Sequence, residues 1–264
     1  MKNKKYSFIF QNLNLSHKTI LDAATGAGGA TLRWAKEIDK SDANSKIISV
    51  DKYDIPGENE KEWKNSIIQT LGDYKKYVRL KKGDIFNLDF IKNNSIDIIN
   101  CDNTIVFLNK KPLKLMKALK EFKRVLRPGG MLIIVSEDSY TKFNSQNKNQ
   151  WKRWSLSKAI YNLNGKTWSN EPKLKEVMDA LKILSFKKED SLKIDPIRND
   201  TNYKTIINEW KKIMDIEVDT LQFSENLKSS LKKEVEKIYN QVLEEKYLMT
   251  FSYWILKARL KEKS

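Results

Sequence analysis

The sequence predicts an α/β protein in which a doubly wound, mostly parallel sheet is covered by helices on both faces. Between residues 18 and 136, short β-branched runs alternate with amphipathic helical patterns, and such alternation is typical of parallel β-α-β units. The strand runs are almost continuously apolar, as expected for strands buried on both faces. A glycine-rich turn follows the first run directly.

The first half of this region supplies three strands and two helices. Residues 18–23 and 46–51 are β-branched runs, and residues 31–38 between them place apolar side chains at helical spacing. Residues 60–74 carry Trp and Ile residues on one helical face, and residues 77–80 form the next apolar run. This half therefore predicts the order strand, helix, strand, helix, strand.

The second half repeats the pattern. Residues 95–101 (SIDIINC) predict a fourth strand, and residues 113–126 an amphipathic helix. Pro128 and two following glycines end that helix before a fifth strand at residues 131–135. The whole region thus supplies five strands for one parallel sheet.

The pattern changes after the fifth strand. Residues 137–170 are polar and rich in aromatic side chains, without a clear strand pattern. The later predicted elements are a helix at 174–184, a strand at 186–194, helices at 203–214 and 227–247, and a strand at 248–256. We interpret the chain as a single domain over residues 1–264, with a core at 18–136 and cap insertions at 137–170 and 197–247.

Composition excludes several classes of protein. The chain has 264 residues, one cysteine and one histidine, which excludes a disulfide framework and a thiolate-rich metal site. No apolar run approaches the roughly 18 residues of a membrane span, and the amino terminus lacks a secretory apolar segment, so a cytoplasmic location is expected. The net charge is +16. Only seven basic residues are arginines, and this lysine-dominated excess favours a solvated surface over a nucleic-acid footprint.

The glycine-rich turn is the most informative stretch. Gly26, Gly28 and Gly29 follow the first strand and precede a helix, an arrangement that lets the backbone approach a ligand near a helix amino terminus. The Gly-Lys-Ser/Thr ending of a P-loop is absent. Nicotinamide binding is a weaker alternative, because the final spaced glycine of that fingerprint is missing.

Further motifs follow the turn in a fixed order. They are residues 22–28 (DAATGAG), Asp51 at the end of the second strand, residues 83–85 (GDI) after the third, residues 97–99 (DII) in the fourth, and residues 122–132 (FKRVLRPGGML) before the fifth. In this order they resemble the motifs of class I S-adenosylmethionine-dependent methyltransferases, with Ala24 in place of the family's first glycine. The resemblance implies a Rossmann-like sheet of seven strands with a terminal antiparallel pair and helical cap insertions.

The resemblance also implies S-adenosyl-L-methionine as cofactor and S-adenosyl-L-homocysteine as product. A carboxylate accepts hydrogen bonds from both ribose hydroxyls, which is the role implied for Asp51, and Asp84 would accept from the adenine amine. The residues implied to bind the cofactor are Asp22, Ala24, Gly26, Gly28, Asp51, Lys52, Asp84, Ile85 and Cys101. No metal ligand is expected.

Methyl transfer from a sulfonium depends mainly on proximity and orientation. If the acceptor must lose a proton, Asp102 after the fourth strand is the first candidate for the general base, and Glu137 or Asp138 after the fifth strand are the alternatives. Residues 100–103 (NCDN) lack the Pro-Pro-aromatic motif of amino-directed base methyltransferases, and Cys101 lacks the Pro-Cys setting of cytosine-C5 enzymes. Both of these branches are therefore disfavoured.

Aromatic side chains after the fifth strand are candidates for binding the methyl acceptor. Tyr140, Trp151 and Trp154 could line a pocket for a small molecule, which is the expected acceptor. With the basic residues between them they could instead stack unpaired RNA bases, so an RNA methyltransferase is the alternative. A second alternative is a protein without catalytic activity that binds the cofactor or a partner through its cap helices.

Overall fold

The computed structural model describes residues 2–52, 60–109, 113–138, 148–166, 170–196 and 198–262. The chain forms two compact units, each built from segments far apart in the sequence. The first unit consists of Met1–Glu137, Glu171–Ile194 and Trp254–Ser264, and the second of Asp138–Asn170 and Asp195–Tyr253. The boundaries predicted above for the core and its insertions remain predictions.

The first unit contains a seven-stranded sheet in the order β3-β2-β1-β4-β5-β9-β6. Its strands are β1 (Thr19–Ala23), β2 (Lys46–Asp51), β3 (Val78–Lys82), β4 (Ile96–Asp102), β5 (Leu126–Glu137), β6 (Phe186–Ile194) and β9 (Tyr253–Leu260). The pairs β1-β2, β1-β4, β2-β3 and β4-β5 are parallel. This topology confirms the predicted doubly wound fold.

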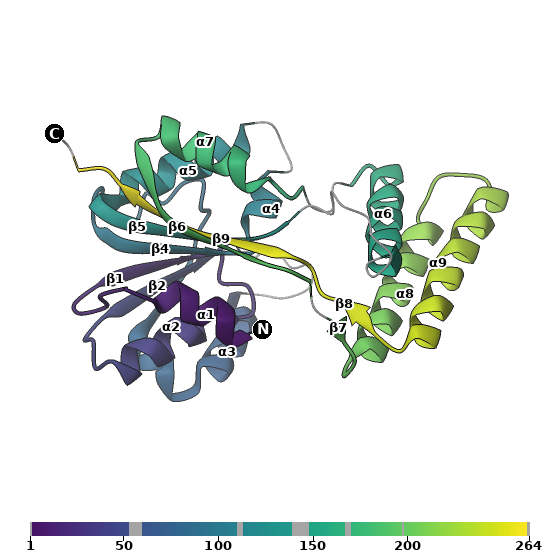
Figure 1. The fold of residues 1–264 in the computed structure, drawn as a ribbon, viewed down its shortest axis with the longest axis horizontal. Helices are drawn as coiled ribbons and strands as arrows, with labels where there is room; N and C mark the ends of the chain where they lie inside the picture. Colours follow the sequence, from purple (N-terminus) through teal and green to yellow (C-terminus); the bar gives the residue numbers. More distant parts are fainter. Residues whose placement is uncertain are drawn as a thin grey trace. The chain divides into compact units, whose positions relative to one another are not determined.

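Helices cover both faces of this sheet (Figure 1). On one side lie α1 (Lys2–Phe10), α2 (Gly29–Lys40), α3 (Glu60–Leu71) and the 3-10 helix η1 (Gly72–Tyr77). On the other lie α4 (Ile105–Leu108), α5 (Lys114–Val125) and α7 (Leu174–Ile183). The apolar spacing of α5 buries Leu119, Phe122 and Val125 completely, so this helix forms much of the core on its side of the sheet.

The second unit is a small helical bundle with a two-stranded ribbon (Figure 1). It contains α6 (Lys148–Leu163), α8 (Tyr203–Asp219), α9 (Glu225–Glu245), and the antiparallel strands β7 (Arg198–Asn199) and β8 (Leu248–Met249). Ile207, Trp210 and Val235 belong to one buried cluster in this unit. The indole of Trp210 donates to Ser157 Oγ at 2.8 Å, which satisfies its buried N–H.

The structure differs from the sequence prediction at several elements. Helices α1 and α4 and the short strand β7 were not predicted, and the predicted strand at 248–256 is divided into β8 and β9. Helix α6 lies in the segment 137–170, for which a cap insertion was expected without a helix being assigned. Strand β9 continues to Leu260 because Ala258 and Leu260 are buried in the sheet core. The charged residue between its apolar positions, Lys257, is also buried and donates from Nζ to the carbonyl oxygen of Gln11 at 2.8 Å. None of the helices in the described part of the chain is long and apolar enough to cross a bilayer.

Candidate active site

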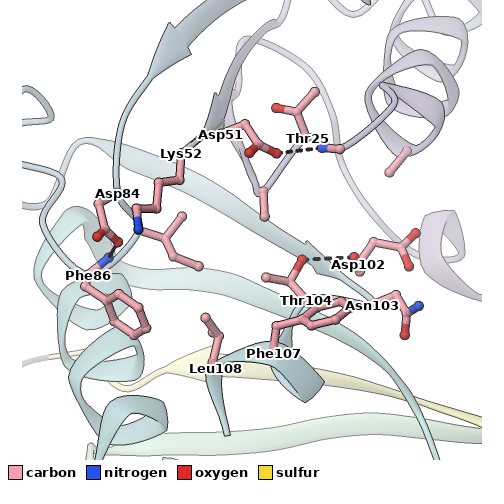
Figure 2. A pocket seen from close by; sticks show the side chains of 14 residues that line it. Thr25, Asp51, Lys52, Asp84, Phe86, Asp102, Asn103, Thr104, Phe107 and Leu108 are labelled. Carbon is pink, nitrogen blue, oxygen red and sulfur yellow. Dashed lines mark hydrogen bonds between the residues drawn. The ribbon is translucent and has the colours of Figure 1, made fainter. Parts of the chain in front are cut away.

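A cavity of about 560 Å³ opens in the first unit at the carboxyl ends of the parallel strands. Figure 2 shows the three acidic side chains that line it, Asp51, Asp84 and Asp102, each beyond or at the end of a different strand. Ligands of open α/β sheets bind at this edge, where the strand order reverses. Because β1 lies between β2 and β4, the cavity lies at that switch point.

The glycine-rich turn forms one wall of the cavity. Ala24 and Gly26 have φ angles of 69° and 52°, and Gly28, the N-cap of α2, has a φ of 79°. A β-carbon at Gly28 would also lie 3.2 Å from Ile67 Cγ2. Glycine suits the left-handed region, so Ala24 adopts a conformation that its side chain disfavours. The missing first glycine of the motif therefore leaves the turn intact but strained at one residue.

Asp51 fixes the turn from the neighbouring strand. Its Oδ2 accepts a hydrogen bond from the Gly26 N–H at 2.7 Å (Figure 2). A carboxylate has about four acceptor sites on its two oxygens, so this bond leaves the side chain able to accept from a ligand as well. The predicted ribose acid and the predicted glycine are thus brought into direct contact.

Asp84 and Ile85 lie on the loop after β3. Asp84 Oδ1 accepts from the Phe86 N–H at 2.9 Å, which holds the loop in a tight turn. In the view of Figure 2, Phe86 lies near Asp84 and Phe107 near Thr104, with Leu108 between them, and all three apolar side chains lie away from Asp51. The cavity therefore has an apolar side suited to a flat ring and a polar side suited to hydroxyl groups.

Asp22, Gly28 and Cys101 were predicted to bind the cofactor, and none of the three is among the residues that line the described cavity. Asp22 is 1% exposed. It accepts from Thr31 Oγ1 at 2.5 Å and from Asn100 Nδ2 at 2.7 Å, and burial raises its pKa to about 6. Burial likewise raises the pKa of the Cys101 thiol to about 12. Asp22 thus joins β1, α2 and β4 beneath the turn, and the thiol is inert at neutral pH.

Asp102 lies at the end of β4 and is bound by helix α1. Lys5 Nζ lies 2.7 Å from each of its carboxylate oxygens, and the Tyr6 hydroxyl lies 3.4 Å from Oδ2. Burial and the charge of Asp102 raise the pKa of Tyr6, so this phenol is neutral. The guanidinium of Arg33 lies over the Tyr6 ring, 5.4 Å from its centroid. The candidate base is therefore an ion-paired carboxylate in contact with the amino-terminal helix.

Lys5 and Tyr6 were not predicted from the sequence as residues of the site. Their partner Asp102 is 97 and 96 residues away in the sequence, and the segment KNKKYSFIF has no clear apolar face. A Lys-Tyr pair near an amino terminus is too common to indicate a site. Their place at the site becomes evident only from the contact between helix α1 and the end of β4.

Of the predicted acceptor-binding residues, the two that the structure describes, Trp151 and Trp154, are not among those that line this cavity. Tyr140 lies outside the described residues. Trp151 and Trp154 are half-buried on α6 in the second unit, and Lys158 Nζ lies 4.3 Å from the Trp154 ring centroid. Across the described residues, no cluster of three or more His, Cys, Asp or Glu side chains is placed to hold a metal ion. Lys52, by contrast, lines the cavity as expected.

These features define a class of protein. The parallel sheet has a cavity at its switch point. A glycine turn fixed by the acid that ends β2 lines this cavity, and so does a second acid after β3. Such a site suits an adenosine-containing cofactor. The volume of the cavity is within the range of small-molecule sites, roughly 300–1,000 Å³. The residues present therefore fit S-adenosylmethionine, with acceptors for its hydroxyls and amine and an apolar side for its adenine.

Comparison with known proteins agrees with this class. A family model for the methyltransferase domain matches residues 14–216. A protein from Bacillus halodurans C-125 proposed to be a methyltransferase has a TM-score of 0.60 and 16% identity, over 98% of each chain. A protein from Galdieria sulphuraria proposed to be a sarcosine dimethylglycine methyltransferase has a TM-score of 0.55 and 15% identity, over 100% of this chain and 87% of that one.

A third similar structure contains bound ligands. Phosphoethanolamine N-methyltransferase 2 from Haemonchus contortus, in complex with phosphomonomethylethanolamine and S-adenosylhomocysteine, has a TM-score of 0.51 and 15% identity, over 99% of this chain and 53% of that one. No curated protein matches the sequence. The chain belongs to the class I S-adenosylmethionine-dependent methyltransferases.

Proposed function

We propose that the chain transfers a methyl group from S-adenosylmethionine bound in the switch-point cavity to a small-molecule acceptor. The observation that carries the proposal is the bond from Gly26 N–H to Asp51 Oδ2 at 2.7 Å. This bond places the Asp51 carboxylate beside the backbone turn, where it can accept hydrogen bonds from both ribose hydroxyls of the cofactor. Asp84 accepts from the adenine amine, while Ile85, Phe86 and Leu108 supply the apolar surface around the ring.

The bound cofactor supplies an electrophilic methyl group on a sulfonium. The residues of this chain contribute binding, orientation and exclusion of water, which are sufficient when the acceptor is itself a nucleophile. Asp102 remains the candidate base for an acceptor that must lose a proton. Since both its oxygens are bound to Lys5 Nζ, it accepts that proton only in competition with this ammonium.

The similar structures support a small acceptor. One is a protein proposed to methylate sarcosine or dimethylglycine, and another is a phosphoethanolamine methyltransferase in complex with phosphomonomethylethanolamine. The basic excess of the chain gives weaker support to RNA, because it consists mostly of lysines, which lack the bidentate contacts that arginine makes to phosphate and guanine.

The test uses methyl-labelled cofactor, the full chain and a cell extract separated into small-molecule, RNA and protein fractions. Asp51→Ala identifies labelling that requires this site. Asp73→Ala is the matched control, because Asp73 is an exposed acid on η1 outside the cavity. We expect label in the small-molecule fraction with wild type and Asp73→Ala, and loss of that label with Asp51→Ala.

Other outcomes contradict the proposal in different ways. Label in RNA overturns the small-molecule acceptor and makes Trp151 and Trp154 candidates for base stacking. Cofactor binding without label in any fraction favours a protein without methyltransferase activity. Label that persists with Asp51→Ala overturns the assignment of the cavity.

A further inference from the structure

The ion pair between Lys5 and Asp102 lies at one end of the switch-point cavity. Asp102 lines the cavity, and Lys5 Nζ of helix α1 lies 2.7 Å from each of its carboxylate oxygens. The side chain of Asp102 is 11% exposed and that of Lys5 is 21% exposed, so solvent still reaches the pair. The cavity therefore ends at a positive and a negative charge that lie side by side.

Three acids lie along the carboxyl edge of the sheet in the order of its strands. Asp84 follows β3, Asp51 ends β2 and Asp102 ends β4, and the glycine turn after β1 lies between the last two. The three side chains keep this order across the cavity in Figure 2. Neighbouring strands lie about 4.8 Å apart, so the ends of β2 and β4 are about 10 Å apart. A ligand with its adenine at Asp84 and its ribose at Asp51 therefore extends its remaining part past the turn towards Asp102.

The acid within β1 is not available to this remaining part. Asp22 is 1% exposed, and its oxygens already accept from Thr31 Oγ1 and Asn100 Nδ2. Among the described residues that line the cavity, the acids are Asp51, Asp84 and Asp102. Since the first two are assigned to the ribose and the adenine, Asp102 is the acid left for a cationic group of the ligand.

The ion pair retains capacity for further hydrogen bonds. A carboxylate has about four acceptor sites and an ammonium has three donors. Lys5 occupies one site on each oxygen of Asp102, and the Tyr6 hydroxyl lies 3.4 Å from Oδ2. At least one acceptor site on Asp102 and one N–H on Lys5 therefore remain. An α-amino acid carries an ammonium and a carboxylate on one carbon, so its two charges match those of the pair.

Helix α1 does not depend on this ion pair for its position. Ile9 is completely buried, and the ring of Phe10 packs edge-on against Trp34 with 4.9 Å between the centroids. Lys257 Nζ donates to the carbonyl oxygen of Gln11 at 2.8 Å. Because the carboxyl end of α1 is fixed in this way, a substitution at Lys5 tests the charge rather than the presence of the helix.

We propose that Lys5 and Asp102 together bind the amino-acid end of the cofactor. Asp102 accepts from the α-ammonium, and Lys5 donates to the α-carboxylate. This inference rests on the proposed function, because it takes the adenine and ribose positions from there. Asp102 then binds the cofactor instead of removing a proton from the acceptor.

The test of Asp102 compares two ligands by calorimetric titration of the full chain. S-adenosylhomocysteine carries the amino acid, whereas 5′-methylthioadenosine keeps the adenosine and the thioether but lacks it. We expect the wild type to prefer S-adenosylhomocysteine by about 100-fold, since each of two charge-assisted bonds contributes about tenfold. Asp102→Asn should reduce this preference to about tenfold by weakening S-adenosylhomocysteine alone. A residue that acted only as a base would leave the preference unchanged.

The test of Lys5 uses decarboxylated S-adenosylhomocysteine, which keeps the amine and lacks the carboxylate. We expect the wild type to bind this analogue about tenfold more weakly than S-adenosylhomocysteine, and Lys5→Met to bind the two about equally. Lys4→Met is the matched control, because Lys4 is an exposed lysine on the same helix, and it should keep the wild-type preferences. Far-UV circular dichroism and the melting temperature check that each variant is folded.

The outcomes separate this inference from the proposed function. If neither S-adenosylhomocysteine nor 5′-methylthioadenosine binds the wild type, the cofactor site itself is wrong and the inference fails with it. If both bind with equal affinity, the cofactor site stands and the role of the ion pair is overturned. Equal weakening of both ligands by Asp102→Asn, a wild-type preference for the carboxylate in Lys5→Met, or a changed preference in Lys4→Met would also overturn it.

Discussion

Asp51→Ala offers the sharpest test of the cofactor site. The substitution removes a carboxylate whose Oδ2 holds the Gly26 N–H at 2.7 Å and which we assign to the ribose hydroxyls. A hydrogen bond to a charged group contributes about 1.5–3 kcal/mol. Because Asp51 is only half-buried, we take the lower end for each of two hydroxyl bonds, about 3 kcal/mol together, which corresponds to about 150-fold in affinity.

The assay is calorimetric titration with S-adenosylhomocysteine, which measures binding without an acceptor. Asp73→Ala removes an exposed acid outside the cavity, so we expect it to retain the affinity of the wild type. A change within threefold for Asp51→Ala would refute the assignment of this carboxylate to the ribose.

An analogue of S-adenosylhomocysteine that lacks both ribose hydroxyls separates a direct role of Asp51 from an effect on the turn. If Asp51 binds the hydroxyls, wild type loses affinity for the analogue, whereas Asp51→Ala binds the analogue and S-adenosylhomocysteine about equally. If Asp51 only stabilises the Gly26 backbone, both proteins discriminate against the analogue to the same degree.

Three further predictions concern stability, measured by chemical denaturation. The pKa of Asp22 rises from 3.8 to about 6 on folding, so the native state binds more protons than the unfolded state between these values, and this group's contribution to stability falls as the pH rises. The free energy of unfolding of Asp22→Asn relative to wild type should therefore increase by about 2 kcal/mol between pH 4 and pH 7.5; a pH-independent difference would contradict the shift. Ala24→Gly should stabilise the protein by about 0.5–1 kcal/mol, because φ at Ala24 is 69°, and a loss of stability would show that the strain is absent. Lys5→Met should lower the free energy of unfolding by about 2 kcal/mol, because it leaves the carboxylate of Asp102, which is 11% exposed, without its partner. The double variant Lys5→Met/Asp102→Asn should recover most of that loss of stability. Additive losses of stability would indicate that the two residues are not coupled.

The sequence allowed the sheet and the polar wall of the cavity to be predicted because both depend on local patterns. Asp51 and Gly26 each lie at the end of a short apolar run, and parallel strands bring such ends to one edge. The order of the motifs along the chain then matched that of the family, and this match indicated the role of each motif. The hydrogen bond from the Gly26 N–H to Asp51 itself was not predicted.

The remaining features depend on contacts between distant residues. Lys5 reaches Asp102 across 97 positions, and the buried Lys257 in β9 donates a hydrogen bond to the backbone carbonyl oxygen of Gln11. Asp22 looks like a cofactor ligand from its motif, yet its carboxylate is occupied by Thr31 and Asn100. Local sequence patterns do not reveal these contacts, because burial in the folded protein determines which polar groups meet.

The place of β9 in the sheet, between β5 and β6, imposes an order on assembly during synthesis at the ribosome. Strands β1 to β5 can pair once residue 137 has emerged. Strand β6 emerges next, but its neighbour in the sheet appears only about 60 residues later, after the whole helical bundle. At roughly 5–20 residues per second, Phe186 and the other apolar side chains of β6 therefore remain without their partner strand for several seconds.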